Sequence, residues 1–291
     1  MSILVTGSTG RIGSQVVNQL AASGASVRAL TRAPEKATFP TGVAAVRGDL
    51  LDADAMRAAL EGVKTLFLLV SNAPDELTQA INTLGLAREA GVTGIVYLSV
   101  TRSAEYTDVA HFASKHAVER MIEQMHLPAT ILRPSYFIQN DATFKDPLTK
   151  AGLYVSPIGD KGVSMVDVRD ITDAAVIELL RRDRAPAALP PATYELVGPD
   201  ALTGRSLAAI WSEALGREVH YAGNDLDAFE KAVKAKAPAW LAYDLRAMMN
   251  RYQADGAVAT RDDLNRLTAL LGRPPRSYCD FARDTARGWQ S

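Results

Sequence analysis

The residues best suited to chemistry lie at the start of the chain, where three glycines follow a short apolar run at residues 3–5 (ILV). This run lacks polar alternation, as expected of a strand buried on both faces. Gly7 allows a tight turn, Gly10 lets a phosphate approach the backbone without a Cβ in the way, and Gly13 lets a helix pack close to the strand. Apolar residues at helical spacing from Ile12 onward predict that helix. Its first amides, at the positive end of the helix dipole, would then face a pyrophosphate.

The glycine spacing is G-x-x-G-x-x-G, not G-x-G-x-x-G, and three glycines also suit an ordinary turn between a strand and a helix. The position of the turn after a buried strand, with further strand–helix units behind it, favours dinucleotide binding. The cofactor contacts predicted in this turn are Gly7, Thr9, Gly10, Arg11, Ile12 and Gly13.

The end of the second predicted strand bears on the choice between NAD and NADP. A dinucleotide fold that binds NAD places a carboxylate here, against the 2′-hydroxyl of the adenosine ribose. This sequence has Leu30, Thr31 and Arg32 and no carboxylate, and the planar guanidinium of Arg32 could pair with a 2′-phosphate. The other interpretation of Arg32 is a solvated arginine beside the sheet. The sequence therefore predicts NADP(H) as the preferred cofactor, with NAD(H) as the alternative.

The ends of the third and fourth predicted strands supply further contacts. Asp49 could accept a hydrogen bond from the adenine amine, or could instead be a turn or N-cap residue before the next helix. The backbone at the end of the fourth strand would border the ribose and the nicotinamide. The cofactor contacts predicted at these two strand ends are Asp49, Leu50, Leu69, Val70 and Ser71.

Strands and helices alternate through the first half of the chain, and this alternation must position the predicted contacts. The predicted strands after the first are residues 26–30, 44–47, 65–70, 95–100 and 130–132, and the predicted helices include 52–60, 74–90 and 110–125. Such alternation predicts an α/β fold of the Rossmann type, with a doubly wound parallel sheet covered by helices on both faces. Ligands of such sheets bind at the carboxyl ends of the strands.

The second half of the chain has a different pattern. Residues 141–161 carry scattered turn residues, 166–182 return to a strand-end and helix pattern, and 181–191 form a linker rich in Pro and Ala. After a short strand near 194–197, helices are predicted at about 203–215, 225–236, 239–254, 261–271 and 278–287. We therefore expect a Rossmann domain of residues 1–134 plus about 166–183. A smaller, mainly helical substrate-binding lobe would contain about 135–165 plus 190–291.

Composition excludes several functional classes. With 32 Lys and Arg against 33 Asp and Glu, the net charge of −1 provides no basic surface for nucleic acid or an anionic membrane. Cys279 is the single cysteine, so neither an intrachain disulfide nor a cysteine-based zinc site is expected. Apolar runs are too short for a membrane span and no targeting segment is evident, so we expect a cytoplasmic protein. We also expect a monomer or homodimer without a metal.

Seven motifs together resemble the NmrA-like branch of the atypical short-chain dehydrogenases/reductases. They are residues 5–13 (VTGSTGRIG), 47–50 (RGDL), 97–99 (YLS), 111–115 (HFASK), 132–134 (LRP), 166–171 (VDVRDI) and 194–199 (YELVGP). The resemblance spans nearly the whole chain and implies an NAD(P)-binding fold. Members of this family include quinone reductases, azo-dye reductases, benzylic ether reductases and redox-sensing regulators without known turnover.

The resemblance also implies catalytic residues. The parent superfamily uses a Ser and a Tyr-x-x-x-Lys motif, in which Tyr donates a proton and Lys holds the nicotinamide ribose. Ser99 and Lys115 match this pattern, but position 111 is His. His111 and Lys115 share a helix face, and His is a credible general acid near neutrality. The predicted catalytic residues are Lys115, His111 and Ser99, although His111 could instead only bond nearby backbone and Tyr106 could replace it as the acid.

The resemblance further implies that Tyr136 and Phe137 flank the nicotinamide, while core filling is the other interpretation of both. Loss of the motif tyrosine argues against an ordinary alcohol dehydrogenase, because ketone reduction needs more help from a protein acid than quinone reduction does. We therefore expect an NAD(P)H-dependent reductase that passes hydride to a conjugated acceptor such as a quinone or azo compound. Its partner would be an aromatic or quinone-like small molecule. The alternatives are an NADP(H)-sensing regulator and a tailoring enzyme for aromatic or polyketide substrates.

Overall fold

A computed structural model describes residues 2–290, and the chain divides into two compact units. The first unit contains the chain up to Val100, together with Ser114–Arg133 and Arg169–Tyr194. The second contains Thr101–Ala113, Pro134–Val168 and the chain from Glu195 onward. Each unit therefore consists of three separate stretches of sequence.

A seven-stranded sheet forms the centre of the first unit, within the described residues. Its order is β3-β2-β1-β4-β5-β6-β8. The strands are β1 (Ser2–Val5), β2 (Val27–Thr31), β3 (Ala44–Arg47), β4 (Val63–Leu68), β5 (Gly94–Leu98), β6 (Ala129–Pro134) and β8 (Ala192–Leu196). Every neighbouring pair from β3 to β6 is parallel. The chain order reverses between β1 and β4, which is where doubly wound sheets bind ligands, and the predicted Rossmann-type fold is confirmed.

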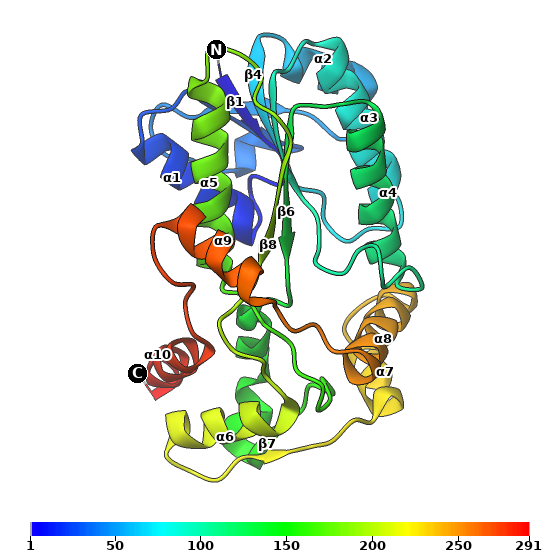
Figure 1. Cartoon of the computed structure of the whole chain (residues 1–291), viewed down its shortest axis with the longest axis vertical. Helices are drawn as coiled ribbons and strands as arrows, with labels where there is room; N and C mark the ends of the chain where they lie inside the picture. The colour runs from blue at the N-terminus through cyan, green and yellow to red at the C-terminus, as the bar shows by residue number, and fades with distance from the viewer. Residues whose placement is uncertain (1, 291) are drawn as a thin grey trace. The chain divides into compact units, whose positions relative to one another are not determined.

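Helices cover both faces of this sheet. Figure 1 shows α1 (Arg11–Ala22) and α5 (Val168–Arg184) on one face, and α2 (Ala53–Leu60), α3 (Glu76–Glu89) and α4 (Ala110–Gln124) on the other. All five residues of β5 are buried, as a strand covered on both sides requires. One apolar cluster extends from β1 through β4 and β5 to the inner faces of α2, α3 and α4.

Local sequence sets several helix boundaries. The carboxylate of Asp52 accepts hydrogen bonds from the amides of Asp54 (3.1 Å) and Ala55 (3.0 Å), so Asp52 is the N-cap of α2. The predicted start of the next helix at Pro74 is wrong, because Asp75 is the N-cap and α3 begins at Glu76. Gly91 has the left-handed backbone (φ 73°) expected of a residue that ends a helix.

Two predicted strands extend too far toward their carboxyl ends. The apolar sequence continues to Val70 and Val100, but the last pairing between β4 and β5 joins Leu68 to Tyr97. The residues that follow each strand are therefore loop residues at the edge of the sheet. Apolar composition extends past these strand ends because the loop that follows each strand is itself largely buried.

The second unit is mainly helical among the residues described. It contains two short helical segments at Ile138–Phe144 and Pro147–Ala151, strands β7 (Leu153–Tyr154) and β9 (His220–Tyr221), and helices α6 (Gly204–Leu215), α7 (Leu226–Lys234), α8 (Ala239–Ala254), α9 (Arg261–Leu271) and α10 (Tyr278–Gln290). The predicted helices are all present, and Gly216 and Gly272 end α6 and α9 in the left-handed conformation. The parallel pair β7–β9 was not predicted, since two-residue strands carry no measurable periodicity.

The predicted linker at residues 181–191 begins too early, because α5 continues to Arg184. The helix continues because Arg182, which lies in this segment, has a buried side chain. Its guanidinium donates to Thr130 Oγ1 (2.8 Å) and to the carbonyls of Pro128 (3.0 Å) and Pro190 (3.0 Å). These bonds hold the last turn of α5 and the following segment to β6. Burial lowers the Arg182 pKa to about 10.

No helix among residues 2–290 has the combination of length and apolarity that a membrane crossing needs. The same described residues contain no group of three or more His, Cys, Asp or Glu side chains placed to hold a metal ion.

Candidate cofactor and active sites

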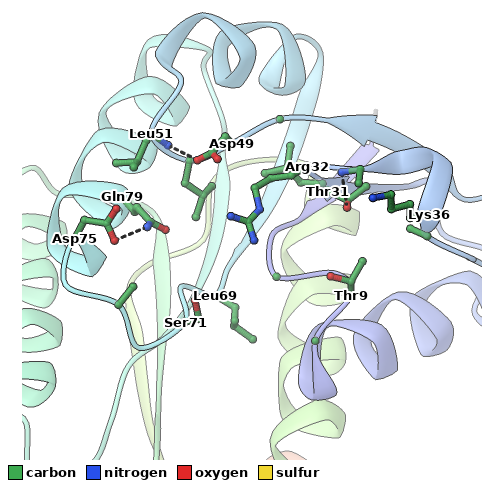
Figure 2. A pocket seen from close by; sticks show the side chains of 18 residues that line it. Thr9, Thr31, Arg32, Lys36, Asp49, Leu51, Leu69, Ser71, Asp75 and Gln79 are labelled. Carbon is green, nitrogen blue, oxygen red and sulfur yellow. Dashed lines mark hydrogen bonds between the residues drawn. The ribbon is translucent and has the colours of Figure 1, made fainter. Parts of the chain in front are cut away.

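A cavity of about 740 Å³ lies in the first unit at the carboxyl ends of the strands on either side of β1 (Figure 2). Its lining includes eight of the predicted cofactor contacts, namely Gly7, Thr9, Gly10, Arg32, Asp49, Leu50, Leu69 and Ser71. Arg11, Ile12, Gly13, Val70 and Lys115 belong to the same unit but do not line this cavity.

The glycine turn has the geometry that its sequence predicted. Gly7 is in the left-handed region (φ 60°), and the Gly10 amide donates to the Gly7 carbonyl (3.0 Å). Gly10 is also the N-cap of α1, and no side chain caps the helix there. A Cβ on Gly13 would lie 2.1 Å from the Gly7 carbonyl oxygen, so only glycine permits α1 to pack this closely on the turn. The cradle therefore consists of main chain without side-chain obstruction.

Two buried hydroxyls that sequence reasoning missed fasten this turn to neighbouring strands. Thr6 Oγ1 contacts both the carbonyl and the amide of Leu69, each at 2.8 Å, beyond the end of β4. Ser8 Oγ donates to the Leu30 carbonyl near the end of β2 (2.7 Å). Both side chains are fully buried. The sequence signal for them was the presence of two hydroxyl residues in the turn directly after a buried strand.

One wall of the cavity is cationic. Arg32 is exposed beyond β2 and extends its guanidinium into the cavity, and Lys36 lines the same side from the short helix Pro34–Lys36 (Figure 2). The nearby Arg47 is occupied elsewhere, because it pairs with Glu35 (2.8 Å) and donates to the Arg32 carbonyl (2.8 Å). Lys36 was missed by sequence reasoning, and the available signal was a second cation four residues after Arg32.

The opposite wall is acidic and partly apolar. Asp49 Oδ1 accepts from the Leu51 amide (3.0 Å), so Asp49 has the predicted turn role while its side chain still lines the cavity. Asp75 and Gln79, which were not predicted, bond to each other at the start of α3 (2.8 Å) and also line the cavity (Figure 2). Leu51 is an exposed leucine on this side (51% exposed), a surface against which a flat ring could lie.

The candidate catalytic residues of the first unit, Lys115 and Ser99, each contact a buried glutamate. Lys115 Nζ lies 2.5 Å from Glu76 Oε1, and both side chains are nearly buried. The Ser99 hydroxyl donates to Glu119, which also receives two hydrogen bonds from Arg133 (2.6 and 3.0 Å). Neither glutamate was predicted, because the partners are far apart in sequence. Ser99 is thus engaged in a buried network.

Tyr97 lies beside this network at the end of β5. Its pKa is raised well above the usual range, first because the side chain is buried and then because the carboxylates of Glu76 and Glu119 oppose a phenolate. Tyr97 therefore stays a neutral phenol.

His111 contacts Asp244 of α8, and both residues belong to the second unit. The His111 amide donates to Asp244 Oδ1 (3.3 Å), and His111 Nδ1 contacts the other carboxylate oxygen. Asp244 was not predicted. The signal for it was an aspartate on the same helix face as Met248, Tyr252 and other buried residues of α8.

Tyr106, the other predicted acid, is engaged in the second unit. Its hydroxyl donates to the Gly256 carbonyl, and burial raises its pKa to about 12. A phenol that is buried, bonded to a carbonyl and this weakly acidic is poorly suited to release a proton near neutrality.

Tyr136 belongs to a buried cluster around Asp141, also in the second unit. The hydroxyls of Tyr136 (3.2 Å), Tyr154 (2.8 Å) and Tyr278 (2.5 Å) all donate to the Asp141 carboxylate. Burial raises the pKa of Asp141 to about 6, although the three hydroxyl donors oppose this shift. The neighbouring Phe137 forms a backbone bridge with Val166. The predicted nicotinamide contacts of Tyr136 and Phe137 stay predictions.

Comparison with known proteins gives one family and several reductases. The model of the NmrA-like family matches residues 1–265. A (4-alkanoyl-5-oxo-2,5-dihydrofuran-3-yl)methyl phosphate reductase from Streptomyces griseus is 32% identical over 290 residues, which cover 99% of each chain. An NAD(P)H azoreductase from Xenophilus azovorans is 29% identical and covers 97% of this chain and 96% of its own. The NADP(H)-complexed triphenylmethane reductase from Citrobacter sp. has a TM-score of 0.82 at 25% identity, with 99% of each chain covered.

Proposed function

Because this chain belongs to the NmrA-like family, as its motifs predicted, we propose that it is an NAD(P)H-dependent oxidoreductase that reduces a conjugated small molecule. NADPH is the preferred reductant, and quinones and azo compounds are among the acceptors. The observation that carries this proposal is the cavity of about 740 Å³ between a bare glycine turn and the cationic wall of Arg32 and Lys36.

The residues around the cavity fit a dinucleotide. The first amides of α1 would bind the pyrophosphate beside Gly10, where no side chain caps the helix. A Cβ on Gly13 would force α1 away from this turn, because it would lie 2.1 Å from the Gly7 carbonyl oxygen. Arg32 and Lys36 would bind a ribose 2′-phosphate, since no carboxylate at the end of β2 opposes it. Asp49 and the exposed Leu51 would accommodate the adenine. A bound dihydronicotinamide would supply the hydride.

The acceptor class is inferred from the relatives' names. These names describe an alkanoyl-substituted dihydrofuranone, an azo compound and a triphenylmethane dye, which are three unrelated skeletons. All three are conjugated systems in which an electrophilic atom can take a hydride while the charge spreads over the rest of the molecule. We therefore assign this chain to conjugated acceptors as a class, and not to simple alcohols or ketones. The dihydrofuranone reductase, at 32% identity, also favours the second candidate, a tailoring reductase of small metabolites.

Lys115 would hold the nicotinamide ribose in this proposal. Its ammonium is fixed by Glu76, and this ion pair orients a long side chain that would otherwise sample many rotamers. The pairing also compensates for the burial of both groups, because a nearly buried charged side chain is unfavourable without a partner.

The test separates binding from turnover. Calorimetry with NADPH and NADH first measures affinity for each cofactor. The protein is then mixed with NADPH and a panel of quinones, azo dyes, acyl-furanones and triarylmethane dyes, while the absorbance of reduced nicotinamide is followed. We expect tighter binding of NADPH than of NADH, and consumption with at least one acceptor class. Tight binding without consumption across the panel would contradict the enzyme proposal and would favour an NADP(H) sensor. No binding of either nicotinamide would contradict both functions.

A further inference from the structure

We infer that Asp244 positions His111 as the proton donor for acceptors that become strongly basic anions after hydride addition. This inference rests on the proposed function, because it concerns the second half of the same reduction. His111 lies four residues before Lys115 on α4, so the two positions share one face of the helix. Asp244 comes from α8, far away in the sequence.

Asp244 holds His111 at two points. One carboxylate oxygen accepts the backbone amide of His111 (3.3 Å), and the other contacts ring atom Nδ1. The amide belongs to the first turn of α4, where helix N–H groups have no partner within the helix. A single carboxylate therefore caps the helix and fixes the imidazole ring relative to that helix. The contact at Nδ1 restrains rotation of the ring, and the bond from the amide fixes the carboxylate relative to the helix.

Both side chains of this pair are nearly buried. The side chain of Asp244 is 4% exposed and that of His111 is 11% exposed. A nearly buried carboxylate is unfavourable unless it is paired, so Asp244 depends on its contact with His111. The ring of Phe112 packs against the imidazole in a T-shaped arrangement, with the two ring centroids 4.6 Å apart. This arrangement suits a proton donor better than a residue that only caps the helix.

The carboxylate also determines which nitrogen exchanges the proton. An ionised carboxylate can only accept hydrogen bonds, so Nδ1 must carry a hydrogen toward Asp244. Nε2 is then the nitrogen that gains and loses a proton. Tyr106 is a poor competitor, because its hydroxyl is occupied by the Gly256 carbonyl.

The proposed step balances as follows. A hydride adds to the electrophilic atom of the acceptor, and the nicotinamide is oxidised while the acceptor gains two electrons. The proton on His111 Nε2 moves to the atom that has become basic, and water later reprotonates the imidazole. For an azo compound this atom is the second nitrogen, whose anion is too basic to leave unprotonated. A triarylmethane cation needs no proton, because hydride addition alone gives the neutral product.

This difference between acceptors supplies the experiment. His111→Gln and Asp244→Asn are compared with the unmodified protein at saturating NADPH, with methyl red as the azo acceptor and malachite green as the cationic acceptor. We expect kcat for methyl red to fall roughly 10²-fold in each variant, the usual effect of losing a general acid. We expect kcat for malachite green to change little. Asp255→Asn is the matched control, because it makes the same change at a half-exposed position at the end of α8.

The cationic acceptor also reports whether each variant is folded. A parallel loss with both dyes, or an unchanged rate with both, would overturn the inference while leaving the reductase proposal intact. The inference would likewise be overturned if the unmodified protein reduced malachite green but not methyl red. Failure of the unmodified protein to reduce any acceptor would refute the reductase proposal, and this inference with it.

Discussion

At the scale of single residues, we predict that Arg32 determines the choice between NADPH and NADH. Its side chain is exposed and extends into the cavity, with no carboxylate at the end of β2 to compete for it. Arg32→Ala should weaken NADPH binding about 10- to 100-fold, which corresponds to the loss of a charge-assisted hydrogen bond, and should change NADH binding much less. Calorimetric titration with each cofactor measures both effects.

Arg57→Ala is the control for this prediction. Arg57 is an exposed cation on α2 that pairs with Asp54 (3.1 Å) and does not line the cavity. Its removal should leave both affinities unchanged. An equal loss of NADPH and NADH affinity in the Arg32 variant would remove the assigned preference for NADP(H).

Pairings between distant residues mark the limit of what the sequence could predict at this scale. Gly7, Gly10 and Arg32 were identifiable because their roles follow from spacing and from position after a strand. Asp244 is 133 residues from His111, and only the folded chain brings the two together. Glu76 pairs with Lys115 from 39 residues away, and nothing in the local sequence marks this pairing.

At the scale of elements, the contact between α1 and the glycine turn can be tested directly. Gly13→Ala would place a Cβ 2.1 Å from the Gly7 carbonyl oxygen and 2.6 Å from its carbon, and these atoms are backbone that cannot easily move. We expect a lower free energy of unfolding and loss of NADPH binding, because α1 must shift away from the turn. Denaturant unfolding and calorimetry measure the two effects.

Gly85→Ala in α3 is the matched control. A Cβ there meets nothing within 4 Å, so the same substitution should stabilise the protein by about 0.5–1 kcal/mol through helix propensity. NADPH binding should be unaffected. If both alanine variants behaved alike, the packing argument for Gly13 would be wrong.

Elements with strong apolar periodicity, or with clear capping or helix-ending residues, were predictable. The boundaries of α8 and α9 match the prediction, since an apolar face and a following glycine or cap define such helices. The pair β7–β9 was not predictable, because each strand has two residues and its partner is distant. The end of α5 was mispredicted because a Pro/Ala-rich composition concealed Arg182, whose hydrogen-bond acceptors lie in other segments.

At the scale of the whole molecule, the Asp141 cluster should make stability depend on pH. The folded-state pKa of Asp141 is about 6, above its ordinary value of 3.8, so folding favours the protonated form. The stability that this group contributes is fully present below about pH 4 and is lost as the pH rises through 6. The loss is about 3 kcal/mol for a shift of this size.

Asp141→Asn removes this titration. The variant loses some hydrogen bonding at every pH, but its stability relative to the unmodified protein should improve by up to about 3 kcal/mol between pH 4 and pH 7. Urea unfolding at several pH values measures this difference. The signal is the fluorescence of the cluster's tyrosines and of Trp211, whose indole donates to the Tyr278 hydroxyl (2.9 Å). A difference that stayed constant with pH would show that Asp141 does not titrate in this range.

The two units contain different functional residues. The cavity and Lys115 belong to the first unit, while His111, Asp244 and the Asp141 cluster belong to the second. We propose that the first unit binds the cofactor and that the second supplies acceptor contacts. The predicted cofactor domain includes residues 101–113, whereas the contacts of the folded chain group Thr101–Ala113 with the second unit.

Each unit is assembled from three stretches that alternate along the chain. No single cut can therefore release either unit as one continuous polypeptide, and gene fusion cannot exchange one unit for that of a relative in a single event. New acceptor preferences in such an architecture must arise by substitutions scattered over several segments. The reductases that match this chain from end to end, at about 30% identity, are what such piecemeal divergence would leave.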